Sequence, residues 1–193
     1  MTPRTVPTLA ATVAATLLCL SLSAPGSAQR AAASREVQPR FGGHYRYAES
    51  DARGQERIRA AARSLLSQLN PITRLIAEAR INGMHVPPRI DLQVSPAEIT
   101  TRFVGYGDDE DHSYQSRPGY PNSIVTDSGR DAELTQHFRG GRLEQIFEGE
   151  RGRWYNLFAL DESGEHLRLE IVLTGERLDT PIRVELPYRR IPG

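Results

Sequence analysis

Residues 139 to 156 read RGGRLEQIFEGERGRWYN, and this stretch decides the fold. Apolar and polar side chains alternate on both sides of Gly140-Gly141, a favoured sequence for a two-residue type I′ hairpin. A second turn centred on Glu150-Arg151 follows after another alternating run. A period of two indicates strands with one buried face. Together with the preceding ELTQHF (133–138), the stretch predicts three successive antiparallel strands.

The two turns also predict which residues face each other. Counting outward from the turns places Gln136 opposite Gln145 and Gln145 opposite Asn156. Leu134 then faces Phe147, Phe147 faces Trp154, and Leu143 lies between Phe138 and Phe158. The opposite face carries the charged side chains of Glu133, Arg139, Arg142, Glu144, Glu148 and Arg153, so it is the solvent-exposed face. We therefore expect a row of three amides on the inner face, walled by aromatic and aliphatic groups.

An unpaired buried amide costs about 1–3 kcal/mol, so the amide row needs hydrogen-bond partners. Two interpretations stay open. Neighbouring amides can satisfy one another inside a filled core, or they can orient the polar end of a ligand in an apolar cavity. The second interpretation assigns ligand contacts to Gln136, Gln145 and Asn156, with Trp154 and Phe158 in the wall.

The remaining C-terminal sequence continues the same pattern. About eight period-two segments follow residue 89, separated by turns every ten or so residues, and residues 41–47 form another short strand. Residues 105–123, GYGDDEDHSYQSRPGYPNS, read as a long acidic loop. So many strands in one domain favour an antiparallel up-and-down meander that curls into a closed or half-closed barrel.

Two helices are expected before this meander. Apolar residues spaced three and four apart over 51–69 form one stripe, and Ser50 or Asp51 would cap its start. Asn70-Pro71 begins a second helix that ends at Asn82-Gly83. The fold class is therefore α+β, with a helical pair packed on the sheet.

The closing run 143–190 resembles the last strands of the calycin families, the lipocalins and fatty-acid-binding proteins. Tyr188 and Arg190 stand where the final Tyr-x-Arg of such a strand falls, and Gly43-x-Tyr45 is similar to the Gly-x-Trp of lipocalins. The layout is also similar to that of uncharacterised secreted bacterial proteins, which implies no function. The calycin resemblance implies a barrel that holds a small apolar molecule.

The first 28 residues are typical of a cleaved secretory signal. Arg4 precedes an uncharged apolar run, and Gly26-Ser27-Ala28 fits the small-x-small rule for cleavage. Residues 29–40 would be a flexible leader and residues 41–193 a single domain without a transmembrane segment. The single cysteine, Cys19, lies inside the signal. We expect a secreted or periplasmic protein without disulfides.

The sequence disfavours several other functions. Basic and acidic residues number 24 each, so charge gives no case for nucleic acid. All the basic residues are arginines, which removes lysine-dependent chemistry. Neither the acidic run 107–112 nor the scattered histidines have metal-ligand spacing, and no nucleophile elbow or phosphate loop occurs.

We therefore expect an exported, non-catalytic protein that needs no metal or cofactor. Its partner would be a small apolar molecule in the barrel interior. The alternative is an envelope structural or protein-interaction domain with a filled core and no ligand.

Overall fold

The computed structural model describes residues 38–68, 85–106, 110–126, 129–150, 152–174 and 180–193, and the single residues 71, 74, 75, 78 and 81. The helices are the 3-10 helix η1 (Gln38–Phe41) and the α-helix α2 (Asp51–Gln68). The strands are β1 (Gly43–Tyr47), β2 (Arg89–Val94), β3 (Ile99–Tyr106), β4 (Glu110–Ser116), β5 (Asn122–Val125), β6 (Asp131–Arg139), β7 (Arg142–Gly149), β8 (Gly152–Leu160), β9 (His166–Thr174) and β10 (Ile182–Ile191).

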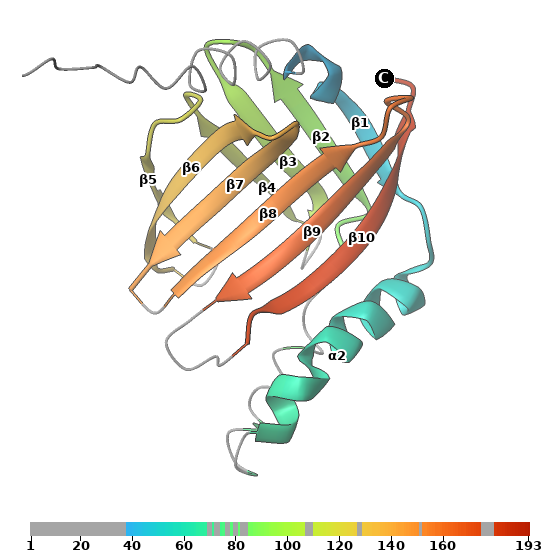
Figure 1. Ribbon diagram of the computed structural model, residues 1–193, viewed down its shortest axis with the longest axis vertical. Coiled ribbons are helices and arrows are strands. Elements are labelled where there is room, and N and C mark those ends of the chain that lie inside the picture. The colour runs from blue at the N-terminus through green and yellow to red at the C-terminus, as the bar shows by residue number, and fades with distance from the viewer. Residues whose placement is uncertain are drawn as a thin grey trace, which may run out of the picture.

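These strands form one ten-stranded antiparallel sheet in the order β4-β3-β2-β1-β10-β9-β8-β7-β6-β5 (Figure 1). The first and last strands of the chain pair with each other, which leaves β4 and β5 as the two edges. The sheet therefore curls until it nearly closes, and the predicted α+β up-and-down meander is confirmed.

The predicted register of the central hairpins is confirmed. Gln136 pairs with Gln145 and Gln145 with Asn156, and Phe147 lies between Leu134 and Trp154. Gly140 and Gly141 have φ angles of 58° and 76°, which suits a turn that needs the left-handed region at both positions. Turn chemistry alone was enough to set this register.

The prediction of one long loop over 105–123 was wrong. Strand β4 occupies residues 110 to 116 of it, and β5 begins at Asn122. His112, Tyr114 and Ser116 lie toward the interior and alternate with exposed neighbours. The period of two was present, but in polar residues that resemble loop composition. Among the described residues, nine strands therefore follow α2 instead of the expected eight or so.

Helix α2 begins as the sequence predicts. The amides of Arg53 and Gly54 donate to the Ser50 carbonyl at 3.0 and 3.1 Å, which makes Ser50 the N-cap residue. Ile58 and Ala62 are buried, and the helix packs against β10 at one end of the barrel (Figure 1). This placement buries the apolar stripe that the helix sequence carries.

Several expectations lie wholly or partly outside the described residues. The signal sequence and residues 29–37 of the leader belong to this group, whereas residues 38–40 form most of η1. Of the second helix expected over 71–82, the five described residues are helical. No helix among the described residues is long and apolar enough to cross a membrane.

One end of the barrel is plugged by η1. Phe41 is fully buried, and its ring meets that of Phe138 edge-on at a centroid distance of 5.3 Å. Arg190 of β10 holds this end together, because it donates to the carbonyls of Arg40, Gly42 and Gly164 at 2.7 Å each. We call this the closed end of the barrel.

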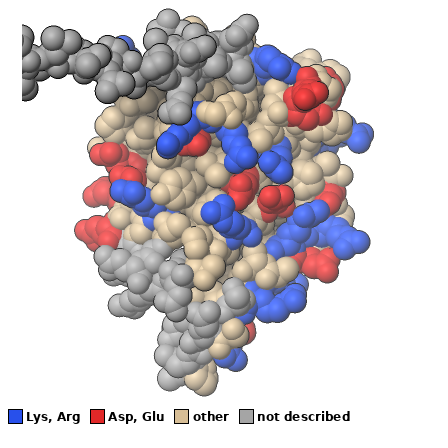
Figure 2. All heavy atoms as spheres, in the orientation of Figure 1, with Lys and Arg blue, Asp and Glu red and all other residues tan. Residues whose placement is uncertain are grey.

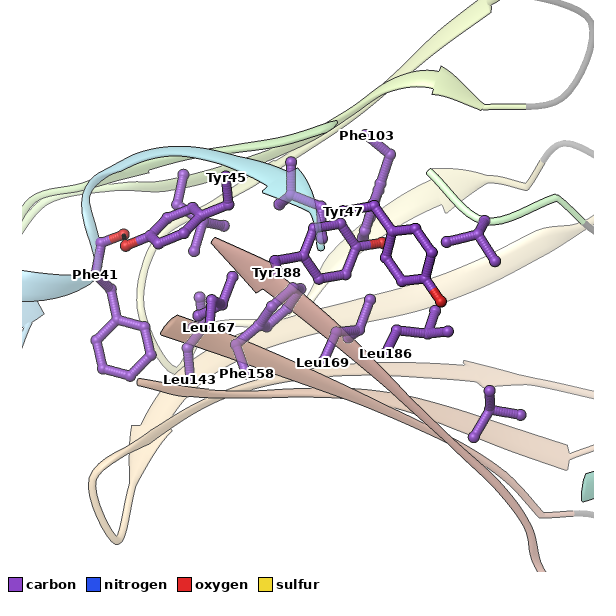
Figure 3. Close-up of a cluster of buried hydrophobic side chains, with 14 of the residues drawn as sticks. Phe41, Tyr45, Tyr47, Phe103, Leu143, Phe158, Leu167, Leu169, Leu186 and Tyr188 are labelled. Carbon is purple, nitrogen blue, oxygen red and sulfur yellow. Dashed lines mark hydrogen bonds between the residues drawn. The ribbon is translucent and has the colours of Figure 1, made fainter. Parts of the chain in front are cut away.

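The interior near the closed end is filled by side chains. Figure 3 shows Tyr45, Tyr188, Leu167, Leu169 and Phe158, from the neighbouring strands β1, β10, β9 and β8, together in one buried cluster. All five of these residues are at most 1% exposed. The outer face in Figure 2 carries interspersed arginines and carboxylates without a patch of one sign. Because the closed end is filled, any larger internal space among the described residues lies toward the opposite end, which carries the β7–β8 turn and which we call the open end.

Candidate ligand cavity

A series of aromatic rings crosses the middle of the barrel. Phe158 of β8 stacks on Phe103 of β3 at 6.4 Å, and Phe103 meets Tyr114 of β4 edge-on at 6.0 Å. Tyr114 meets Phe147 of β7 at 5.0 Å, and Phe147 stacks on Trp154 at 4.2 Å. Because the rings come from four strands on both sides of the interior, they separate the filled closed end from the open end.

On the open side of these rings lies a cavity of about 230 Å³. Pro87, Phe103, His112, Tyr114, Phe147, Trp154, Asn156, Leu169, Ile171 and Leu173 line it. Eight of these residues are apolar or carry large apolar rings, and side-chain polar atoms come only from His112, Tyr114, Trp154 and Asn156. An apolar wall with a few polar groups is the usual construction of a small-molecule site.

The predicted amide row forms a continuous hydrogen-bonded chain. Asn156 Nδ2 donates to Gln145 Oε1 at 2.7 Å, and Gln145 Nε2 donates to Gln136 Oε1 at 3.0 Å. Both glutamines are fully buried, and Asn156 is 7% exposed. The amides satisfy one another as the first interpretation expected, while Asn156 also faces the cavity.

Gln136 extends this chain across the gap between the two sheet edges. Its Oε1 accepts from Thr101 Oγ1 at 2.9 Å, and its Nε2 donates to the Ile99 carbonyl and Ser116 Oγ at 3.1 Å each. The amide of Gly119, in the turn after β4, donates to the Gln136 carbonyl at 2.7 Å. These bonds replace the missing strand pairing and close the gap near Ser116.

The five sequence-predicted site residues divide into two groups. Trp154 and Asn156 line the cavity. Gln136, Gln145 and Phe158 are fully enclosed behind it, where the glutamines support Asn156 and Phe158 supports the aromatic series. Contact of these five residues with a ligand stays a prediction.

Sequence reasoning missed the wall contributed by β3 and β4. Phe103, His112 and Tyr114 line the cavity, yet the last two lay in the segment read as a loop. Their alternation with exposed Asp111 and Ser113 is the signal that could have identified them.

A wider hollow of about 510 Å³ adjoins the cavity at the open end. The turns between β5 and β6 and between β7 and β8 form its rim, and it shares Trp154 and Leu173 with the cavity. Trp154 and Leu173 therefore lie between the wider hollow and the cavity.

Arg190, the arginine of the calycin-like Tyr-x-Arg stretch in β10, already has hydrogen-bond partners at the closed end. Besides its three carbonyl partners, Arg190 donates to Tyr45 Oη at 2.6 Å and lies 4.8 Å over the Tyr45 ring. Burial raises the pKa of Tyr45 despite this neighbouring cation, so the pair stays a phenol and a guanidinium. Arg190 thus joins β1, η1 and β10 and does not line the cavity.

Comparison with known proteins shows the same fold in fatty-acid-binding proteins. Fatty-acid-binding protein 1 of Echinococcus granulosus superimposes with a TM-score of 0.52 and 12% identity, over 80% of this chain and 99% of that one. The Schistosoma mansoni fatty-acid-binding protein in complex with arachidonic acid superimposes with a TM-score of 0.51 and 14% identity, over 81% of this chain and 99% of that one. No protein-family model and no curated protein sequence matches the chain. The likeness to calycin barrels is thus one of structure.

Proposed function

We propose that this protein is a non-catalytic binder of a small apolar molecule, which it holds inside the barrel on the open side of the aromatic series. The observation that carries the proposal is the 230 Å³ cavity walled by Phe103, Tyr114, Phe147 and Trp154. Burial of apolar ligand surface contributes roughly 25 cal/mol per Å². The two structural neighbours are named for binding fatty acids, and neither name describes a reaction, which supports binding over catalysis.

Native mass spectrometry of the mature protein, purified gently from a bacterial host, tests this proposal directly. An extra mass that disappears on denaturation supports a ligand in the barrel. Trp154 provides a second readout, because it is the only tryptophan of the chain and lines the cavity. Apolar ligands that enter the cavity should shift or quench its emission.

A matched pair of variants localises the binding. Ile171→Phe places a ring in the cavity, whereas Arg168→Phe places the same ring on the outer face of the same strand. Loss of binding only in Ile171→Phe supports the cavity. Equal affinity in both variants would exclude it as the site.

A chain-length series measures how much of the ligand is buried. For unbranched alcohols, each added CH2 should contribute about 0.8 kcal/mol, or roughly a fourfold gain in affinity, until the cavity is full. Affinity that does not change with chain length would argue against an apolar site.

The packed closed end favours a second candidate function. Tyr45, Leu167 and Tyr188 fill that half of the interior, and the buried amides need no ligand. A protein whose purified form has the bare monomer mass and whose Trp154 emission responds to no apolar molecule would be an envelope structural or protein-interaction domain.

We also propose export through the N-terminal signal, supported by the apolar run after Arg4 and the small residues that end at Ala28. The N-terminal residue of the protein recovered from the bacterial periplasm tests this. Gln29 is expected, and a product that retains the first 28 residues would contradict export by cleavage.

A further inference from the structure

The hydrogen bonds along Asn156, Gln145 and Gln136 all run in one direction, and this direction bears on the kind of polar group that a ligand in the cavity would carry. The inference rests on the proposed function and adds the chemical class of the ligand. Amide oxygen and nitrogen atoms are interchangeable in shape, so their orientation must be derived from their partners. Here the chain ends on partners of unambiguous character.

The derivation starts at Gln136. One atom of its amide contacts the Ile99 carbonyl at 3.1 Å and the Tyr114 carbonyl at 3.4 Å. Carbonyls only accept hydrogen bonds, so this atom is the nitrogen. The other atom, the oxygen, therefore faces Gln145.

The same reasoning fixes the orientation of the next two amides, Gln145 and Asn156. Because Gln136 offers an oxygen, Gln145 must donate to it through nitrogen and must turn its own oxygen toward Asn156. Asn156 must then donate to Gln145 through Nδ2, at 2.7 Å. The one remaining heteroatom of the row is Asn156 Oδ1, a hydrogen-bond acceptor.

Asn156 Oδ1 lies at the cavity end of the row. Asn156 lines the cavity, and its Oδ1 accepts no hydrogen bond from the part of the chain that the structure describes. An acceptor in an apolar wall is matched by a donor on the ligand. A ligand acceptor placed against Asn156 would leave two oxygens facing each other.

The charge of the wall restricts the ligand further. Among the described residues that line the cavity, none is an arginine, and His112 is the one side chain able to carry a positive charge. Arg190 is engaged at the closed end. An ionised carboxylate inside the cavity would be both desolvated and placed beside an acceptor, which is unfavourable.

We propose that the ligand is an uncharged apolar molecule with a hydroxyl or comparable donor group, and that this donor binds Asn156 Oδ1. The polar end enters first and the chain extends past Trp154 toward the open end. Although the structural neighbours are fatty-acid-binding proteins, a long-chain alcohol fits this cavity better than a fatty-acid anion.

Three probes of equal chain length test the proposal at pH 8, where a fatty acid is ionised: 1-decanol, methyl decanoate and decanoate. Their affinities are measured from Trp154 emission and checked by calorimetry. Decanol is expected to bind about tenfold or more tightly than either of the others. Decanoate or the ester binding as tightly as decanol would overturn the proposed donor preference and leave the proposed function intact. No binding of any probe would overturn both.

The variant Asn156→Leu assigns the preference to one atom. It removes the acceptor at nearly constant volume, so decanol should lose its advantage over methyl decanoate while the affinity for the ester changes little. An unchanged advantage would overturn the role of Asn156. Because the wild-type comparison is independent of any substitution, the proposal stays falsifiable if this variant does not fold.

A second variant covers the opposite orientation of the ligand. Arg130 is exposed on the rim of the wider hollow and would lie near a carboxylate directed outward. Tight decanoate binding that is lost in Arg130→Gln would place the polar end at the rim and overturn the proposed orientation. The proposal expects equal decanol affinity in the wild type and in Arg130→Gln.

Discussion

At the residue scale, the side chain of Gln136 links two strands that the sheet does not pair, across the interior of the barrel. It connects β6 to β3 and β4 through Thr101, Ile99 and Ser116, and it ends the chain of amides that begins at Asn156. Its hydrogen bonds are all inside the barrel, where an unpaired group cannot recover them from water.

Gln136→Leu should therefore destabilise the protein by at least about 2 kcal/mol, because several buried groups lose their partner at about 1–3 kcal/mol each. Urea unfolding measures this change. Gln115→Leu on the exposed face of β4 is the matched control and should stay within about 0.5 kcal/mol of the wild type. Similar losses in both variants would argue against the bridging role.

Arg190 has an equally specific role at the closed end. Arg190→Lys keeps the charge but cannot reproduce a planar fork that reaches three carbonyls and a phenol. We expect a loss of about 2 kcal/mol or more in unfolding free energy, with faster amide exchange around Gly42 and Gly164. Arg189→Lys, at the exposed neighbouring position, should change neither quantity.

Tyr47 should make stability depend on alkaline pH. Burial, followed by the Glu49 carboxylate, raises the pKa of its phenol to about 12, whereas an unfolded tyrosine titrates near 10. The contribution is thus fully present below about pH 10 and is lost as the pH rises toward 12. Unfolding free energies measured across this range should fall less steeply for Tyr47→Phe, and parallel curves would contradict this assignment.

At the scale of elements, α2 shows packing overriding helix propensity. Gly54 lies in the first half of the helix, where alanine would be favoured by about 1 kcal/mol. A Cβ at this position would approach Val86 Cγ2 to 2.5 Å and Tyr47 Oη to 3.1 Å. The glycine therefore allows the helix to lie close to Val86 and to the end of β1 at Tyr47.

Gly54→Ala should accordingly destabilise the protein, since overpacking costs about 1–3 kcal/mol and exceeds the gain in propensity. Thermal unfolding should show a lower Tm. The same substitution in a Val86→Ala background removes the 2.5 Å contact with Val86 Cγ2 and should be less destabilising than in the wild-type background. A stabilising effect of Gly54→Ala alone would mean that α2 is free to move away from the barrel.

At the scale of the whole molecule, the barrel has a packed end and an open end, and its sheet has two edges. Strands β8 and β9 are paired on both sides, whereas β4 and β5 are each paired on one side only. Beyond the Gln136 bridge, His112 of β4 lines the cavity close to this incomplete seam. Local opening should therefore begin at β4 and β5.

Amide hydrogen exchange should follow this order, with β4 and β5 exchanging before β8 and β9. A ligand in the cavity contacts His112 and Tyr114, so it should slow exchange in β4 more than in β10. Uniform slowing over all strands would indicate only global stabilisation by binding.

Much of this molecule could be predicted from its sequence, because turn chemistry and a period of two act over a few residues. The double-glycine hairpin determined the pairing of Gln136, Gln145 and Asn156, and the stripe from Ile58 determined the buried face of α2. The same local signals failed at β4, where the inward residues are polar and the flanking sequence is acidic and rich in glycine.

Only the tertiary structure decided which of these residues line the cavity. The pattern placed the amides and aromatics on one inner face, but it could not show that Gln136 meets Thr101 from the far edge or that Phe41 fills the closed end. Those contacts join segments far apart in the chain, and the cavity is what remains after every such side chain is placed. Local rules determine the direction of a side chain, whereas the volume beside it depends on the packing of all ten strands.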